Sequence, residues 1–267
     1  MRHSLPRLAL SLPVIMLLHV LLLAPVPVVR ALPLGQERPH AFKPWILGAG
    51  DASYLQVTGF PSPVTAGATE NFDVTVKDSG GDTVTDYVGT VHFTSSDPLA
   101  DLPADYAFVP GDAGTHSFSA ALATAGSGHT ITATDVKDGS ITGTQTGIEI
   151  TAAGASTLQV EGYPTPATAG EGHTITVTVK DAYGNTVTGY LGTVTFTSND
   201  PQAVLPGGYT FVPEDAGTKD FGVTLKTVGS GRSVTVTDTV NGSITGTQTG
   251  IEITAAMYSV HLPLILR

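Results

Sequence analysis

Residues 72–77 read Phe-Asp-Val-Thr-Val-Lys, and residues 175–180 read Ile-Thr-Val-Thr-Val-Lys. In both stretches an apolar residue occupies every second position, and a polar residue lies between each pair. Successive side chains of a β-strand point to opposite faces, so this alternation indicates a strand that is buried on one face and exposed on the other. The pattern predicts a half-buried strand at each place.

The two stretches are part of a duplication that covers most of the chain. Residues 55–153 align with residues 158–256 without a gap, and roughly two in three aligned positions are identical, as expected of one domain copied. The longest identical run is 139–153 against 242–256. It can be a core strand copied with the domain, or an edge that pairs with a strand of a partner. We favour the core strand.

Further short alternating runs follow along each copy, bounded by Gly, Pro, Asp and Asn. The glycine-containing segments 78–82 and 181–185 are predicted to be hairpin turns. Pro61 and Pro63 follow the first strand, where a missing amide donor is tolerated at an edge or at a switch between sheets. Short strands with frequent turns predict an all-β protein made of two tandem Greek-key β-sandwiches. The inward positions predicted in repeat 1 are Val91, Phe93, Phe118, Ala120, Leu122, Ile131, Ala133, Ile148 and Ile150.

The ends of the chain differ from the repeats. Arg2 and Arg7 precede an almost wholly apolar stretch up to Val29, which predicts a signal peptide over residues 1–31 and a secreted protein. The alternative is an uncleaved anchor, but Pro13 interrupts the run. We assign residues 32–52 to a linker, 53–153 to repeat 1, 154–157 to a second linker and 158–256 to repeat 2. Residues 257–267 form an apolar tail, either an edge strand or a docking tag, and too short to span a bilayer as a helix.

Charge and cysteine content narrow the classes of function. The net charge is −11, and removal of the leader takes away three arginines and no acid. An acidic surface disfavours nucleic acid as a partner, because phosphate binding requires Lys and Arg. The chain has no cysteine, so each domain must be held by burial alone, and cysteine-based metal sites and thiolate catalysis are excluded.

A resemblance follows from residues 179–187, Val-Lys-Asp-Ala-Tyr-Gly-Asn-Thr-Val, and from residues 112–115, Asp-Ala-Gly-Thr, with Phe118 and Leu122. These residues resemble the bacterial immunoglobulin-like repeats of invasin-type surface proteins, and more loosely filamin repeats. The resemblance covers both repeats. It implies an immunoglobulin-like fold in extracellular stalks, adhesins or spacers, with no catalytic residues to carry over.

No catalytic or cofactor-binding residue is predicted. The histidines of one copy face other residue types in the other: His92 aligns with Thr195, His116 with Lys219, His129 with Arg232, and Glu70 with His173. We expect them on solvated strand faces. The remaining chemical candidates are loop aspartates that recur in both copies, because calcium prefers clustered carboxylates. Asx turns are the favoured alternative. The calcium candidates are Asp78, Asp97, Asp112, Asp181, Asp200 and Asp215.

These observations favour a non-catalytic structural or adhesive module at a bacterial cell surface, a spacer or stalk with a cell-surface or matrix protein or a glycan as partner. The alternative is a carbohydrate- or protein-binding module that uses loops at one end of a sandwich, where Tyr183 against Gly80 is the one aromatic difference. A secreted enzyme or enzyme accessory is a distant third.

Overall fold

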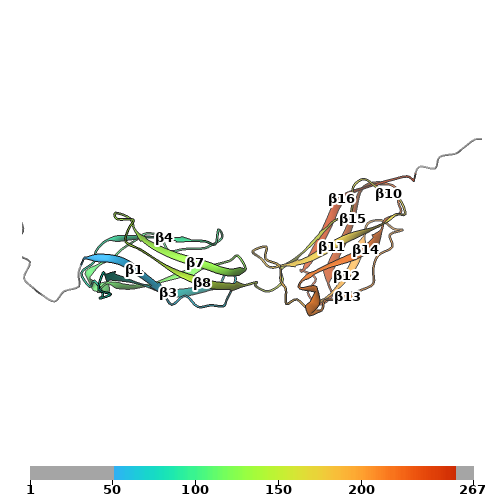
Figure 1. Ribbon diagram of the computed structural model, residues 1–267. Helices are drawn as coiled ribbons and strands as arrows, with labels where there is room; N and C mark the ends of the chain where they lie inside the picture. The colour runs from blue at the N-terminus through green and yellow to red at the C-terminus, as the bar shows by residue number, and fades with distance from the viewer. Residues whose placement is uncertain (1–50, 257–267) are drawn as a thin grey trace, which may run out of the picture. The chain divides into compact units, whose positions relative to one another are not determined.

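The computed structural model describes residues 51–256, in which each repeat forms its own β-sandwich (Figure 1). In repeat 1 a three-stranded sheet has the order β1-β3-β6, and a five-stranded sheet has the order β2-β8-β7-β4-β5. The first sheet consists of β1 (Ala52–Thr58), β3 (Thr69–Asp78) and β6 (Thr115–Ala121). The second consists of β2 (Val64–Thr65), β8 (Thr142–Thr151), β7 (Gly126–Asp135), β4 (Thr90–Ser95) and β5 (Tyr106–Ala107).

Repeat 2 has the same two sheets, in the orders β9-β11-β14 and β10-β16-β15-β12-β13. Its strands are β9 (Thr157–Glu161), β10 (Ala167–Thr168), β11 (Gly172–Lys180), β12 (Thr193–Ser198), β13 (Tyr209–Thr210), β14 (Thr218–Thr224), β15 (Gly229–Asp238) and β16 (Thr245–Thr254). A short 3-10 turn precedes β6 and β14, as η1 (Pro110–Asp112) and η2 (Pro213–Asp215). The predicted all-β fold of two immunoglobulin-like sandwiches is confirmed.

The strand that opened the sequence analysis lies in the middle of the smaller sheet. β3 pairs antiparallel with β1 on one side and with β6 on the other, and Phe72 lies opposite Phe118. Phe72, Val74 and Val76 are almost completely buried, while the residues between them face outward or are half-buried. The predicted register is therefore correct. All nine inward positions predicted in repeat 1 are also buried.

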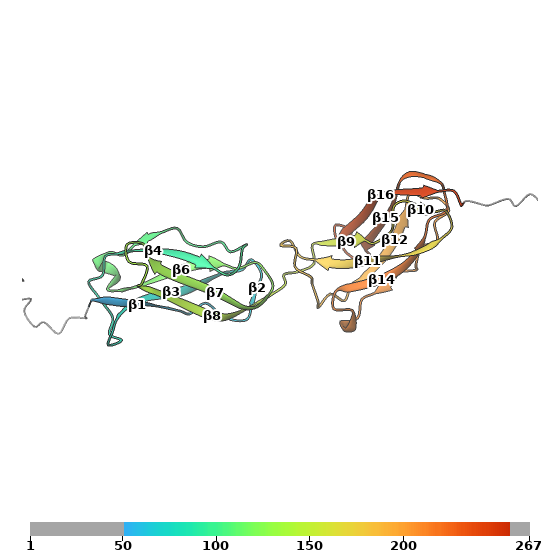
Figure 2. The same ribbon diagram turned by 45° about the horizontal axis from the view of Figure 1, so that its top comes forward.

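In each repeat the polypeptide passes from the smaller sheet to the larger one after its first strand. β1 pairs with β3 in the smaller sheet, whereas β2 pairs parallel with β8 in the larger one, with Val64 opposite Ile150 (Figure 2). Pro61 and Pro63 lie in the connection between β1 and β2. Because proline has no amide hydrogen to donate to a ladder, the switch is where it is tolerated, as predicted.

The identical run near the end of each repeat holds this switch in place. The Gln145 side chain accepts a hydrogen bond from Phe60 N at 3.0 Å and donates one to Phe60 O at 2.6 Å. A Cβ atom on Gly143 would lie 1.7 Å from the Leu55 carbonyl oxygen, so only glycine fits there. Gln248 and Gly246 make the same contacts in repeat 2. These contacts, with buried Ile148 and Ile150, show that the run contains residues that the fold needs, in keeping with the core strand favoured from sequence.

Aromatic rings fill much of the core, and burial of each stabilises its repeat by about 1.5–3 kcal/mol. In repeat 1 the ring of Phe118 lies 4.7 Å from that of Phe93 and 5.7 Å from that of Phe72. Repeat 2 keeps the pair Phe196 and Phe221 at 4.7 Å and has Ile175 in place of Phe72.

Within residues 51–256 no helix is long and apolar enough to cross a membrane. The predicted signal peptide at 1–31, most of the first linker and the apolar tail at 257–267 lie outside the described residues.

Candidate functional site

Two deeply buried calcium candidates at equivalent positions, Asp97 in repeat 1 and Asp200 in repeat 2, each hold two loops together. Each is 3% exposed and lies just after β4 or β12. Asp97 Oδ2 accepts hydrogen bonds from Ala123 N at 2.6 Å and Thr124 N at 2.9 Å, beyond the end of β6. Its Oδ1 accepts from Leu99 N at 2.9 Å and from the Thr124 hydroxyl. The carboxylate therefore joins two segments of the same end of the sandwich.

Asp200 repeats this arrangement with Gln202 N, Lys226 N, and the amide and hydroxyl of Thr227. Burial by itself raises the pKa of Asp200, but the hydrogen bonds outweigh it and lower the pKa to about 2. The pKa of Asp97 is shifted downward by the same opposition of burial and hydrogen bonds. Both groups are therefore ionised at neutral pH, and their oxygen atoms already accept hydrogen bonds from the protein itself.

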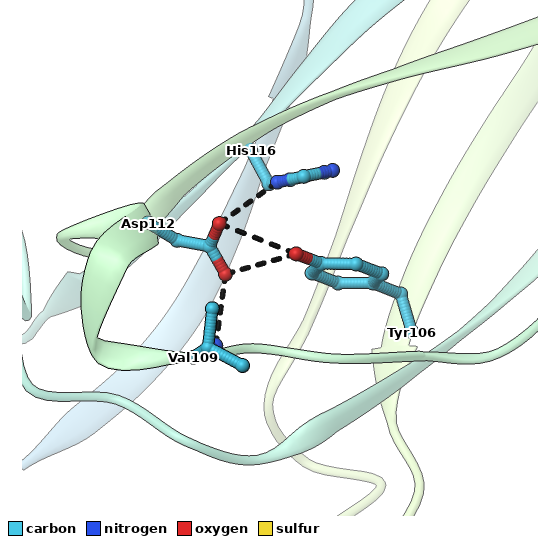
Figure 3. A network of polar contacts seen from close by, with 4 residues as sticks. All are labelled: Tyr106, Val109, Asp112 and His116. Atoms are coloured by element: carbon cyan, nitrogen blue, oxygen red, sulfur yellow. Dashed lines mark hydrogen bonds and ion pairs between the residues drawn. The ribbon is translucent and has the colours of Figure 1, made fainter.

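Asp112 in repeat 1 forms the polar network of Figure 3, at the 3-10 turn before β6. Its carboxylate accepts hydrogen bonds from Val109 N at 2.8 Å and from the Tyr106 hydroxyl at 3.1 Å, and it lies 2.9 Å from His116 Nδ1. The His116 ring stacks on Tyr106 with centroids 4.1 Å apart. The hydrogen bond from the Val109 amide lowers the pKa of Asp112 below its ordinary value. Burial acts in the opposite direction, and the His116 side chain lowers the pKa further.

Asp215 has the same role in repeat 2, with a lysine in place of the histidine. Its carboxylate accepts from Val212 N at 3.0 Å, from the Tyr209 hydroxyl at 2.9 Å and from Lys219 Nζ at 3.0 Å. The ammonium group of Lys219 also lies 5.3 Å from the centroid of the Tyr209 ring. The networks differ only in whether imidazole or ammonium faces the carboxylate.

Asp78 and Asp181 form Asx turns at the ends of β3 and β11. Asp78 Oδ1 accepts from Gly80 N and Asp82 N, both at 2.9 Å. Asp181 Oδ1 accepts in the same way from Tyr183 N at 2.9 Å and Asn185 N at 2.8 Å. The predicted hairpins are seen only in part, because the chain returns along β3 or β11 at one isolated bridge, Lys77–Thr83 or Lys180–Thr186, and the next longer strand lies in the other sheet. The alternative role that we favoured for the aspartates is observed here.

The six calcium candidates do not come together. In the part of the chain that the structure describes, no three His, Asp or Glu side chains lie where they could hold one metal ion. Each candidate instead accepts hydrogen bonds from neighbouring amides or hydroxyls. Calcium binding by these residues stays a prediction, for which a chelator measurement is the test.

A hydrogen-bonded Tyr–Asp pair recurs in both repeats. That these two residues contact each other was not predicted from the sequence. The Tyr87 hydroxyl donates a short hydrogen bond to Asp135 Oδ2, and Tyr190 does the same to Asp238. Asp135 Oδ1 also accepts from the amides of Lys137 and Asp138, both at 2.7 Å. Burial, and then the neighbouring carboxylate, raise the pKa of Tyr87. Both residues of the pair are identical in the two copies, and this identity was the only feature of the sequence that pointed to them.

Two histidines depart from the solvated positions that we expected. The His116 side chain is 33% exposed and stacked as described. His173 Nε2 is buried without a hydrogen-bond partner, and its ring meets Tyr163 edge-on with centroids 5.1 Å apart. His92 is more than half exposed, as expected, with Nδ1 2.6 Å from Asp105 Oδ1. The expectation was wrong for His116 and His173 because each lies two residues before a buried core residue of its strand, Phe118 or Ile175, on the inward-facing side, where an aromatic neighbour covers its ring.

No protein-family model matches the sequence, and no curated protein matches it. Among solved structures, the Escherichia coli adhesin FdeC is similar at 18% identity over 77% of this chain and 66% of that chain, with a TM-score of 0.41. The Yersinia pseudotuberculosis adhesin InvE is similar at 16% identity over 74% of this chain and 58% of that chain, with a TM-score of 0.30.

A β-glycosidase from Bacteroides vulgatus is similar at 12% identity over 76% of this chain and 25% of that chain, with a TM-score of 0.35. The chain thus spans less than two thirds of each of these proteins. Bacterial adhesins and surface-layer proteins are among its structural neighbours, in keeping with the resemblance seen in the sequence. Because glycosidases are similar as well, the likeness concerns the fold and leaves the activity to other observations.

Proposed function

We propose that the chain is a non-catalytic structural module of a bacterial cell surface, a spacer built from two immunoglobulin-like repeats. The observation that carries this proposal is the use of the recurring carboxylates. The carboxylates of Asp97, Asp112, Asp200 and Asp215 accept hydrogen bonds from amides and hydroxyls of their own repeat, and that of Asp215 also from the Lys219 ammonium group. Their recurrence in both copies therefore supports a shared framework more than a shared reaction.

The way each repeat is held also supports a spacer. Each has its own cluster of buried apolar side chains, with no cysteine to cross-link it. Two sandwiches that each complete their own core give a chain that can keep its shape outside the cell without a cofactor. The acidic composition favours solubility there.

A binding module that uses loops at a sandwich end is the alternative from sequence, and Tyr183 was its aromatic candidate. The ring is 43% exposed, but its edge lies against Gly67 of repeat 1. Part of the surface that a ligand would need is thus taken up by a contact within the chain.

The proposal is tested in the producing bacterium with antibodies against residues 51–256. We expect protease added to intact cells to remove the antibody signal while a cytoplasmic marker survives. Protection of the chain in intact cells would contradict a surface location. In a second arm, the purified chain is applied to matrix proteins and glycans; saturable binding to one class would replace the spacer with the binding module.

A chelator arm separates a metal-dependent fold from one held by burial. We expect thermal unfolding of the purified chain to be unchanged by EDTA and by added calcium, because a ligand that binds only the folded state raises its stability. A fall of many degrees with EDTA would restore the calcium candidates.

A further inference from the structure

The turn 181–185 in repeat 2 differs from its counterpart 78–82 in repeat 1 at the residues that form its tip. The flanking residues Val-Lys-Asp and Thr-Val-Thr are identical in the two copies. Between them, Ala182 replaces Ser79, Tyr183 replaces Gly80 and Asn185 replaces Asp82, and the last two make the contacts described below. The Asx hydrogen bonds that shape the turn are the same in both copies, so neither replacement is needed to form it.

The Asn185 side chain binds the main chain of repeat 1. Its Oδ1 accepts a hydrogen bond from Ala125 N at 2.8 Å, and its Nδ2 donates one to Ala123 O at 2.7 Å. A side-chain amide satisfies both a donor and an acceptor of one backbone segment, as a neighbouring strand would. An ionised aspartate, the residue at position 82, can accept but cannot donate, so it could not make this pair of bonds.

Asp181 adds a second connection at the segment that joins the repeats. Its Oδ1 forms the turn, and its Oδ2 accepts a hydrogen bond from Ala153 N at 2.9 Å and another from Asn185 Nδ2 at 2.8 Å. The carboxylate therefore orients the Asn185 amide and holds the first residues after β8. The pKa of Asp181 is lowered because these hydrogen bonds outweigh the effect of burial, so the group is charged where it is needed.

Tyr183 supplies the apolar part of the contact. A Cβ atom on Gly67 would lie 1.8 Å from the Tyr183 hydroxyl oxygen and 2.2 Å from the ring carbon that carries it. Gly67 also has a φ of +78°, which favours glycine whatever lies nearby. The corresponding Gly170 of repeat 2 has a similar φ of +87° but nothing within 4 Å of a Cβ atom. The same backbone feature is thus covered by a ring in repeat 1 alone.

We propose that the turn 181–185 is a docking element that fixes repeat 2 to the end of repeat 1. In it Asn185 recognises the main chain at 123–125, Tyr183 covers Gly67, and Asp181 holds Ala153. The partner of this surface is the loop end of an immunoglobulin-like repeat, recognised through its backbone. The proposal is independent of where the chain resides and holds whether the chain is a spacer or a binding module.

Distance measurement between the repeats tests this proposal directly. The chain has no cysteine, so cysteines introduced at Val88 in repeat 1 and Val240 in repeat 2, both well exposed, can be spin-labelled without side reactions. Electron paramagnetic resonance on the full chain then gives the distribution of label distances. With the turn docked, we expect one narrow distribution.

The variant Tyr183→Gly/Asn185→Asp gives repeat 2 the residues that repeat 1 has at these two positions. We expect its distance distribution to broaden at least twofold. The matched control, Gly80→Tyr/Asp82→Asn, makes the reverse changes in the turn of repeat 1 and is expected to leave the distribution unchanged. The single variant Asn185→Asp keeps the size of the side chain and the Asx turn, and is expected to broaden the distribution in part.

Circular dichroism and thermal unfolding of each variant confirm that both repeats remain folded. Should the double variant unfold, Asn185→Asp decides the question by itself. Equal widths for the wild type and the folded variants would overturn the proposal. So would equal broadening in the control, because the effect would then come from the substitutions and not from docking.

Discussion

The two repeats place different nitrogen-bearing side chains on the equivalent carboxylate, His116 on Asp112 and Lys219 on Asp215. In each case that side chain also packs on a tyrosine ring, Tyr106 or Tyr209. The position therefore requires a donor that can also cover an aromatic face, and either residue type meets that requirement. The difference between His116 and Lys219 suggested a solvated position with no fixed role. The structure shows that both residues occupy the same position in an equivalent polar network.

A second difference concerns the core. Repeat 1 packs Phe72 edge-on against Phe93 at 5.8 Å, and repeat 2 has Ile175 at the same place. Both side chains are fully or almost fully buried. This core position therefore accepts either an aromatic or an aliphatic side chain in a buried place.

The largest expected effect comes from truncating the shared core phenylalanine. We expect Phe118→Ala and Phe221→Ala to destabilise their own repeats by about 3–5 kcal/mol, as buried aromatic truncations do. Phe118 should cost more, because Phe72, Phe93 and Tyr106 surround it, whereas Phe221 meets two aromatic rings. Hydrogen exchange in urea, resolved by repeat, measures both. Loss of protection in the unmutated repeat would show that the two do not unfold separately.

The next effect concerns the buried loop carboxylates. Asp97→Asn and Asp200→Asn should each cost about 2–4 kcal/mol, because an amide nitrogen replaces an acceptor and leaves buried amide hydrogens without a partner. Since the contacts match, the two costs should agree closely. Urea unfolding midpoints of the two variants provide the comparison, and a large cost in one repeat alone would mean that the two loops are not equivalent.

Acid unfolding sharpens the same comparison. The pKa of Asp200 is about 2 in the folded repeat against an ordinary value of 3.8, so the unfolded chain binds the proton more tightly. The stabilisation is fully present above about pH 4 and is lost as the pH falls toward 2. Asp97 should act in the same direction. Stability measured from pH 5 to pH 2 should fall less steeply in Asp200→Asn than in wild type; equal slopes would contradict the assignment.

A smaller effect is expected from the Tyr–Asp pairs. Tyr87→Phe and Tyr190→Phe remove one donor from a carboxylate that keeps two backbone amides, at a cost of about 1–2 kcal/mol. Thermal unfolding of the two single variants and of the double variant checks this. If the pairs are independent, the double variant should show the sum of the single effects.

The smallest effect is expected from exchanging His116 and Lys219 between the two networks. His116→Lys and Lys219→His each install the residue of the other repeat, so the unfolding midpoint at neutral pH should stay close to that of wild type. The controls His116→Ala and Lys219→Ala remove the donor and should lower it more. A strong loss in either exchange variant would show that the networks are not interchangeable.

Much of the fold was predictable because burial imposes a local pattern. The alternation at 72–77 identified the strand and its inward face, and Pro61 and Pro63 marked the change of sheet. His116 and His173 were misplaced because the expectation rested on their replacement by other residue types in the other copy, although both share the inward face of Phe118 or Ile175 and pack against Tyr106 or Tyr163. The Asx role of Asp78 was favoured correctly, because both its donors lie within four residues.

The sequence by itself determined the duplication, the all-β class, the strand faces and the turns, since each depends on residues that are neighbours along the chain. Only the tertiary structure decided that Tyr87 donates to Asp135, that Gln145 binds Phe60, and that the Asn185 amide meets the backbone at 123–125. These partners are separated by tens of residues. Residue type states which bonds a side chain can make, but stacking of the sheets and apposition of the loops determine which group is within reach.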